Sequence, residues 1–169
     1  AAQGIFVLFT NPRGSTNYGN EFQFMTMNAW GIDDAKDILQ AVDMVVARGL
    51  ADPQKLGISG GSYGGFMTNW LTSQDPRWKA AITDRSISNW LSFYGASDAS
   101  SLVEGEFAGM PWPYQSPDSG SYILATMLSP IVYADKVKTP TRIIHSLNDY
   151  RVPFEEGEQW YRALKKNNV

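Results

Sequence analysis

The sequence has 169 residues, of which 43% are hydrophobic and 13% aromatic, and it carries a formal charge of −3. This composition predicts one packed globular domain and excludes a disordered chain. No basic run indicates a nucleic-acid partner, and no apolar run approaches the roughly 20 residues that span a bilayer, so we expect neither nucleic acid nor a membrane as a partner.

The sequence contains no cysteine and one histidine. Disulfides and thiolate metal sites are therefore excluded, and a histidine metal site is disfavoured. The lack of cysteine favours a cytoplasmic location. The chain starts with AAQGIFVLF, without an initiator Met or a signal-peptide pattern, and stops at LKKNNV. From these two patterns we expect both ends to cut through a larger domain.

In chain order, residues 5–10 (IFVLFT) form a continuous apolar run, which predicts a strand buried on both faces. Residues 33–48 carry their apolar side chains on one helical stripe. Asp33 and Asp34 favour the start of this helix, and Gly49 can end it in a left-handed conformation.

The remaining patterns continue the alternation of strands and helices. They predict strands at 56–59, 79–83 and 141–146 and helices at 63–73 and 154–166. Residues 95–121 are rich in Gly, Ser, Pro and Asp, which predicts loop or short helices. Alternating helices and buried-type strands predict an α/β fold with a parallel sheet.

The stretch GGSYGG places four glycines around Ser62, and residues 60–64 satisfy the pattern G-x-S-x-G. Between a predicted strand and a predicted helix, this pattern predicts a nucleophile elbow, a sharp turn that exposes the serine hydroxyl. Glycines are needed there because the strand and the helix approach closely. The backbone N–H of Tyr63 could then donate to an oxyanion. The alternatives are a glycine-rich turn that only packs and one that cradles phosphate.

A triad acid is expected in the loop after a later strand, and Asp149 occupies that place in RIIHSLNDYRVP. The alternative is a plain turn residue, because Asn-Asp is a common turn pair. The base should follow the acid, yet the only histidine, His145, precedes it. We expect the ring nitrogens of His145 to bond nearby backbone, and the chain to stop before the triad histidine.

Four blocks of the sequence resemble a known family: NPRGSTNYG, GISGGSYGGFMTNW, TDRSISNWLSFYG and TPTRIIHSLNDYRVPFEEGEQWYRALKK. They are similar to the peptidase domain of the prolyl oligopeptidase family of serine peptidases, in its bacterial acylaminoacyl-peptidase-like branch. The resemblance implies that residues 1–169 form one partial α/β-hydrolase domain, with a mostly parallel sheet and helices on both faces. It implies Ser62 as nucleophile, Asp149 as triad acid and Tyr63 as oxyanion donor.

The resemblance also implies a substrate pocket. Trp90 and Phe93 match positions that line the pocket for the residue before the scissile bond, with ordinary core packing as the alternative. Arg151 is expected to face the substrate cleft, with a surface ion pair as the alternative. The family further implies a triad histidine, an upstream HGGP-type loop and a β-propeller domain, which we expect outside these 169 residues.

We therefore expect a serine hydrolase that cleaves short peptides, acyl-peptides or esters through an acyl-serine intermediate. No metal or organic cofactor is implied, because triad chemistry needs none. The 169 residues alone are expected to show negligible triad-type activity, since the base is absent. The alternative is a non-catalytic truncated hydrolase-fold module for binding or self-association, whose open sheet edges favour a homo-oligomer.

Overall fold

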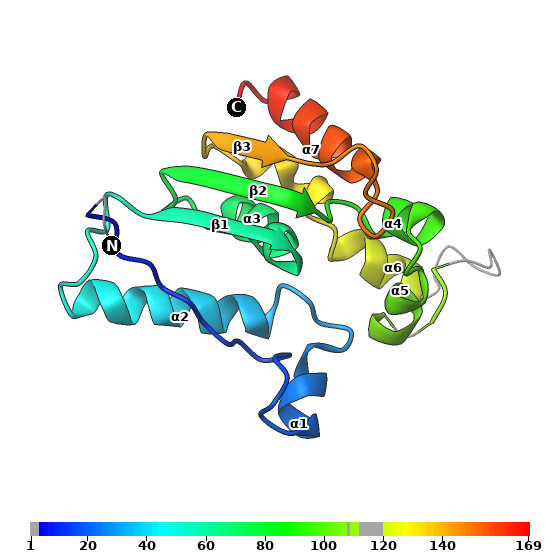
Figure 1. Cartoon of the computed structure of the whole chain (residues 1–169), viewed down its shortest axis with the longest axis horizontal. Coiled ribbons are helices and arrows are strands. Elements are labelled where there is room, and N and C mark those ends of the chain that lie inside the picture. The colour runs from blue at the N-terminus through cyan, green and yellow to red at the C-terminus, as the bar shows by residue number, and fades with distance from the viewer. Residues whose placement is uncertain (1–3, 108, 112–119) are drawn as a thin grey trace.

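Among the described residues, the sheet has three parallel strands. The computed structural model describes residues 4–107, 109–111 and 120–169, so part of the loop region predicted at 95–121 lies outside them. Figure 1 shows the strands side by side, in the order β1 (Gly57–Ser62), β2 (Ala80–Ser86) and β3 (Thr141–Ile144). Both neighbouring pairs are parallel. The predicted parallel sheet is confirmed, with slightly different strand ends.

The helices pack on the sheet and gather beyond the carboxyl ends of its strands. Figure 1 shows α3 behind β1 and β2, and α4, α5 and α6 beyond the arrowheads. The α-helices are α1 (Asn20–Gln23), α2 (Asp33–Ala47), α3 (Tyr63–Gln74), α4 (Trp90–Ala96), α5 (Ser101–Glu106), α6 (Gly120–Met127) and α7 (Phe154–Lys166), and the 3-10 helices are η1 (Phe24–Thr26) and η2 (Pro130–Lys136). The helices predicted at 33–48, 63–73 and 154–166 correspond to α2, α3 and α7.

The ends of α2 follow from its sequence. Asp33 and Asp34 lie in its first turn, where their negative charge faces the positive end of the helix dipole. Gly49 follows the last turn with a φ of 69°, a left-handed conformation that glycine adopts without steric penalty. The predicted stop at Gly49 is confirmed.

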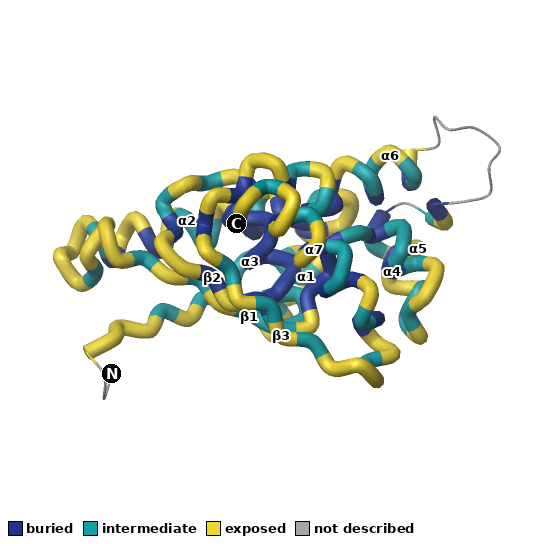
Figure 2. Tube along the Cα trace, turned by 90° about the horizontal axis from the view of Figure 1, so that it is seen from above, coloured by how far each residue is buried: buried dark blue, intermediate teal, exposed yellow. Residues whose placement is uncertain are grey.

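Helix α3 is the centre of the core. Every residue from 65 to 73 is buried, because α3 packs against β1 and β2 of the sheet and against η2. Figure 2 shows the buried trace concentrated along this helix. Phe66 and Leu71 are fully buried, and Trp90 of α4 packs into the same cluster. The core therefore fixes the helix that begins directly after Ser62.

The buried strand predicted at residues 5–10 is wrong. These residues form neither helix nor strand and pair with none of the described strands, and their side chains are largely exposed, with Ile5 at 63% and Phe9 at 89%. Only Leu8 of the apolar run packs against the main core. Figure 1 shows the segment crossing α2. An apolar run is buried only where neighbours cover it, and the described residues supply few here.

The sheet is covered unevenly. Ala81 and Thr83 of β2 are buried toward α3, whereas Ile82, which points to the opposite face, is 41% exposed, and Ile144 of β3 is 43% exposed. No helix among the described residues combines the length and the apolar character needed to cross a membrane.

Candidate active site

The carboxyl ends of the three strands meet at one edge of the sheet. Ser62 ends β1, Ser86 ends β2, and the loop with Asp149 follows β3. Binding sites of open α/β sheets lie outside this edge, because the loops after parallel strands converge there. The sequence-predicted nucleophile and acid are therefore brought to the same edge, together with α4.

Ser62 has a strained backbone at the junction of β1 and α3. Its φ is 57° and its ψ is −117°, a region that non-glycine residues rarely adopt. The pairing of β1 with β2 also shifts in register between Gly61 and Ser62. Strain at a strand-to-helix turn is the feature expected of a nucleophile elbow. The first amides of α3 have no intrahelical acceptor, so they remain available beside Ser62.

Two of the surrounding glycines are required by close approach. A Cβ on Gly60 would lie 2.3 Å from the carbonyl oxygen of Gly64, and a Cβ on Gly65 would lie 2.7 Å from the Cβ of Ser86. A Cβ on Gly64 would meet none of the described residues within 4 Å. The predicted close approach of strand and helix is thus found at Gly60 and Gly65, whereas Gly64 has room for a side chain.

Tyr63 is held by a residue that the sequence did not mark as part of the site. Its hydroxyl donates to Oδ2 of Asp34 at 2.7 Å, and its ring packs edge-on against Trp30 at 5.0 Å. Asp34 is fully buried, and its Oδ1 accepts the N–H of Ala35 at 2.9 Å. Burial raises the pKa of Asp34, and burial together with Asp34 raises the pKa of Tyr63.

Asp149 shapes its own loop. Its Oδ1 accepts the N–H groups of Arg151 at 3.0 Å and Val152 at 2.9 Å, which is the hydrogen bonding of a turn residue. Among the described residues, Oδ2 of Asp149 has no hydrogen bond. Oδ1 therefore acts as the turn alternative predicts, whereas Oδ2 stays free to orient an imidazole. The triad role of Asp149 stays a prediction.

His145 is committed to the loop that carries Asp149. Its Nε2 donates to the carbonyl oxygen of Val152 at 2.8 Å, as expected for a histidine that bonds nearby backbone. Its Nδ1 is buried without a hydrogen-bond partner among the described residues. A Cβ on Gly157 would lie 2.6 Å from this nitrogen, so the ring is packed tightly against α7. A triad base must direct Nε2 toward the serine hydroxyl. In His145 this nitrogen is instead hydrogen-bonded to the carbonyl oxygen of Val152.

The three side chains predicted to bind substrate are engaged within the protein. Trp90 is 0% and Phe93 1% exposed, and Nε1 of Trp90 donates to the carbonyl oxygen of Leu128 at 3.1 Å. Nε of Arg151 donates to Oδ1 of Asp98 at 2.6 Å in an exposed ion pair. The alternatives of core packing and a surface ion pair match these contacts. Contact of these side chains with substrate stays a prediction.

Glu156 joins α7 to the segment that follows β2, and sequence reasoning missed it. Its side chain is 1% exposed, and Oε2 accepts the N–H groups of Ser88 and Asn89, both at 2.8 Å. Its Oε1 accepts the hydroxyl of Ser92 in α4. Burial raises the pKa of this carboxyl, and the hydrogen bonds from Ser92, Asn89 and Ser88 oppose that effect. Glu156 therefore anchors the start of α4 beside the Asp149 loop.

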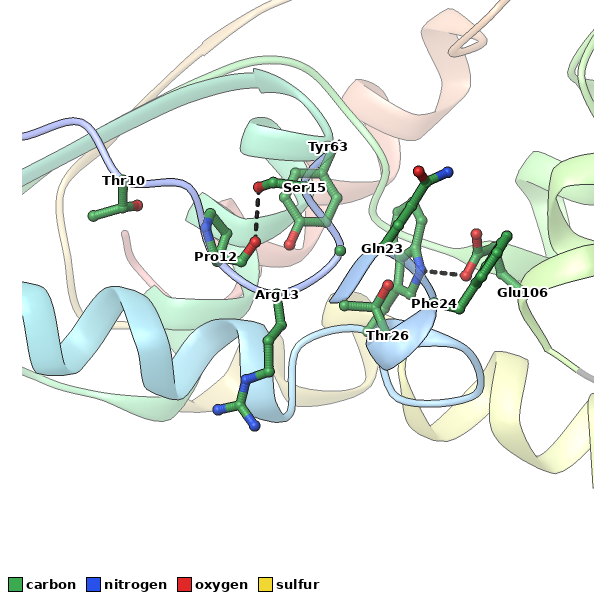
Figure 3. A pocket seen from close by; sticks show the side chains of 11 residues that line it. Thr10, Pro12, Arg13, Ser15, Gln23, Phe24, Thr26, Tyr63 and Glu106 are labelled. Carbon is green, nitrogen blue, oxygen red and sulfur yellow. Dashed lines mark hydrogen bonds between the residues drawn. The ribbon is translucent and has the colours of Figure 1, made fainter. Parts of the chain in front are cut away.

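A cavity of about 420 Å³ is lined in part by Tyr63 (Figure 3). Trp30 lines it, and its Nε1 donates to Oε2 of Glu106 at 2.8 Å. Figure 3 shows Arg13 extending away from the other lining side chains. Its guanidinium binds both carboxylate oxygens of Asp37, at 2.8 and 2.7 Å, so it offers no free charge to the cavity. The described residues hold no cluster of three or more potential metal ligands.

Known proteins are similar to the chain over nearly its whole length. The model of the prolyl oligopeptidase family matches residues 1–169. The chain is 44% identical over 167 residues to "Uncharacterized peptidase YuxL" of Bacillus subtilis, covering 98% of this chain and 24% of that protein. It is 36% identical over 168 residues to the acylamino-acid-releasing enzyme of Arabidopsis thaliana, covering 98% and 22%.

Solved structures give the same result. The acylaminoacyl peptidase of Pyrococcus horikoshii superposes with a TM-score of 0.83 at 36% identity, covering 94% of this chain and 25% of that one. A puromycin-hydrolyzing peptidase of Mycobacterium tuberculosis gives a TM-score of 0.83 at 30% identity, covering 94% and 23%. The chain thus spans about a quarter of the length of the relatives it matches.

Proposed function

The chain belongs to the prolyl oligopeptidase family, whose members are serine peptidases, and from this premise we propose that it supplies the nucleophile of a serine hydrolase. Its substrates are short peptides, peptides with an acylated amino terminus, or esters. The names of the relatives, which include acylamino-acid-releasing enzymes, support the acylated class. In the whole protein we propose a β-propeller as the partner domain and the cytoplasm as the location.

In the proposed reaction, Oγ of Ser62 attacks the carbonyl carbon of the substrate and loses its proton to a histidine base. The oxyanion of the tetrahedral intermediate accepts the N–H of Tyr63, and the leaving group takes the proton from the base. Water then attacks the acyl-serine by the same route and frees Ser62. Asp149 orients the imidazole through Oδ2, the oxygen that its turn leaves unbonded.

The observation that carries the proposal is the backbone of Ser62. A φ of 57° in a serine between a strand and a helix stores strain that a purely structural turn does not need, because glycine would adopt the same φ without it. The chain places glycine on both sides of this residue, at Gly61 and Gly64 beyond Tyr63, but keeps serine at the strained position.

A fluorophosphonate probe tests this proposal on the 169-residue chain. Oγ of Ser62 should displace fluoride and bind phosphorus only when free imidazole is added as the base, because Nε2 of His145 is bonded to the carbonyl oxygen of Val152. Loss of a triad member lowers rates by about 10⁴-fold or more, so labelling without imidazole should be very slow. Intact-protein mass and peptide mapping measure the label.

The control is Ser62→Ala, which should take up no label with or without imidazole. Rapid labelling of Ser62 without imidazole would show that His145 or another group acts as the base. Label on a residue other than Ser62 would contradict the proposed nucleophile.

The alternative, a self-associating module without catalysis, is favoured by the exposed apolar side chains of Ile5, Phe6, Val7 and Phe9, the last at 89%. Sedimentation that shows a compact oligomer, together with no imidazole-dependent label, would support this alternative. A monomer that is labelled at Ser62 would rule it out.

A further inference from the structure

We propose that Asp34 is a positioning residue for the oxyanion donor: its buried carboxylate holds the Tyr63 side chain and so fixes the backbone N–H that follows Ser62. The inference rests on the proposed function, since the N–H of Tyr63 matters only if an anion forms at Ser62. Asp34 is fully buried, so in this proposal it does not contact the substrate itself. It acts through one hydrogen bond, from the Tyr63 hydroxyl to Oδ2 at 2.7 Å.

The clamp on Tyr63 has two sides. One side is the hydrogen bond to Asp34, and the other is the edge-on packing of the ring against Trp30 at 5.0 Å. Trp30 is itself fixed, because its Nε1 donates to Glu106 at 2.8 Å. The ring of Tyr63 is thus held between α2 and the loop before it, while the backbone of Tyr63 begins α3.

The charges around Asp34 leave Tyr63 as its side-chain partner. The nearby cation is Arg13. Its guanidinium donates hydrogen bonds to both carboxylate oxygens of Asp37 and to the carbonyl oxygen of Asp33. Oδ1 of Asp34 accepts the N–H of Ala35 at 2.9 Å, and Oδ2 accepts the hydroxyl of Tyr63 at 2.7 Å. A raised pKa keeps Tyr63 protonated, so its hydroxyl remains a donor near neutral pH.

Such a clamp is needed because the turn is strained. Ser62 holds a φ of 57°, and relaxation of this angle would swing the first amides of α3 away from the Ser62 side chain. Among the described residues, no side chain caps this helix end to resist the movement. The bond between Asp34 and Tyr63 ties the first residue of α3 to α2 across 29 positions of sequence and keeps the turn in place.

The variant Ser62→Cys gives a readout that needs no histidine base. The sequence has no cysteine, so the introduced thiol is the only one. Iodoacetamide alkylates the thiolate with loss of iodide, and amides at a helix N-terminus stabilise the thiolate. The alkylation rate near pH 7 therefore reports how well the first amides of α3 face the side chain at position 62.

In the Ser62→Cys background, we expect Tyr63→Phe to slow alkylation about 5-fold, because the ring keeps its packing but loses the bond to Asp34. Asp34→Ala should slow it by a similar factor. Asp34→Asn should stay within about 2-fold, because its amide oxygen still accepts the Tyr63 hydroxyl. Urea unfolding curves check that each variant is folded under the assay conditions.

Asp37→Asn is the matched control, since it removes a neighbouring negative charge that binds Arg13 and not Tyr63. Its rate should equal that of Ser62→Cys alone. Equal rates for Tyr63→Phe and the parent would overturn the positioning role. So would a matching acceleration in Asp34→Ala and Asp34→Asn, which would mean that Asp34 acts only through its charge. Failure of the proposed function appears separately, as missing phosphonate label on Ser62 itself.

Discussion

Replacing Gly60 with alanine is expected to lower the free energy of unfolding by about 3 kcal/mol or more. The added Cβ would lie 2.3 Å from the carbonyl oxygen and 2.4 Å from the carbonyl carbon of Gly64. Both contacts are with backbone, so no side-chain rotation relieves them, and β1 and α3 would have to move apart. Urea unfolding followed by tryptophan fluorescence measures the loss.

Gly64→Ala is the matched control within the same motif. A Cβ there meets no atom of the described part of the chain within 4 Å, and the residue lies in the first turn of α3. Alanine has a higher helix propensity than glycine. The free energy of unfolding of Gly64→Ala should therefore be unchanged or higher by up to about 1 kcal/mol. Equal destabilisation by the two variants would contradict the claim that close approach, rather than the glycine pattern itself, explains Gly60.

Replacing Glu156 with alanine is expected to lower the free energy of unfolding by about 3–5 kcal/mol. The change leaves the N–H groups of Ser88 and Asn89 without their acceptor inside the protein. The hydroxyl of Ser92 loses its bond to Oε1 as well. Unpaired buried donors cost far more than the net value of the bonds they lose, and the start of α4 should loosen.

Glu155→Ala is the control for this variant, because Glu155 is exposed in the same first turn of α7. It should change stability by less than about 1 kcal/mol, the size of a helix-dipole effect. Similar losses for the two variants would show that charge at the helix end, and not the buried hydrogen bonds, stabilises this region.

The same carboxyl predicts a pH dependence. Burial raises the pKa of Glu156 above its ordinary value of 4.5. The folded state therefore binds the carboxyl proton of Glu156 more tightly than the unfolded state does. The contribution of the protonated carboxyl to the free energy of unfolding is lost as pH rises from 4.5 through the raised pKa. Compared with Glu156→Gln, the wild type should lose stability over this window. The opposite slope would mean that the hydrogen bonds to Glu156 outweigh its burial.

The local part of the site could be predicted from the sequence. Ser62 lies between a short apolar run and a helical spacing, and the glycines on either side restrict the turn to few geometries. The end of α2 at Gly49 is local in the same way. The sequence could not show that Gly60 and Gly65 are required while Gly64 is not, because a pattern does not say which Cβ would clash.

The rest depended on contacts between distant parts of the chain. Asp34 was predicted only as a helix-start charge, since its bond to Tyr63 spans 29 positions, and Glu156 reaches Ser88 across 68. No periodicity marks such pairs. The strand predicted from the apolar run at 5–10 failed for a related reason. A strand needs a neighbouring strand to pair with, and none of the described residues pairs with this run.

The central claim is that the strained turn at Ser62 directs an anion toward the N–H of Tyr63. A crystal structure of the imidazole-assisted phosphonate adduct on Ser62 tests it most directly. We expect the phosphonyl oxygen to lie about 2.7–3.1 Å from the backbone nitrogen of Tyr63. We also expect the φ of Ser62 to stay positive, near its present 57°. An oxygen farther than about 3.5 Å from this nitrogen, or a Ser62 relaxed to negative φ, would contradict the claim.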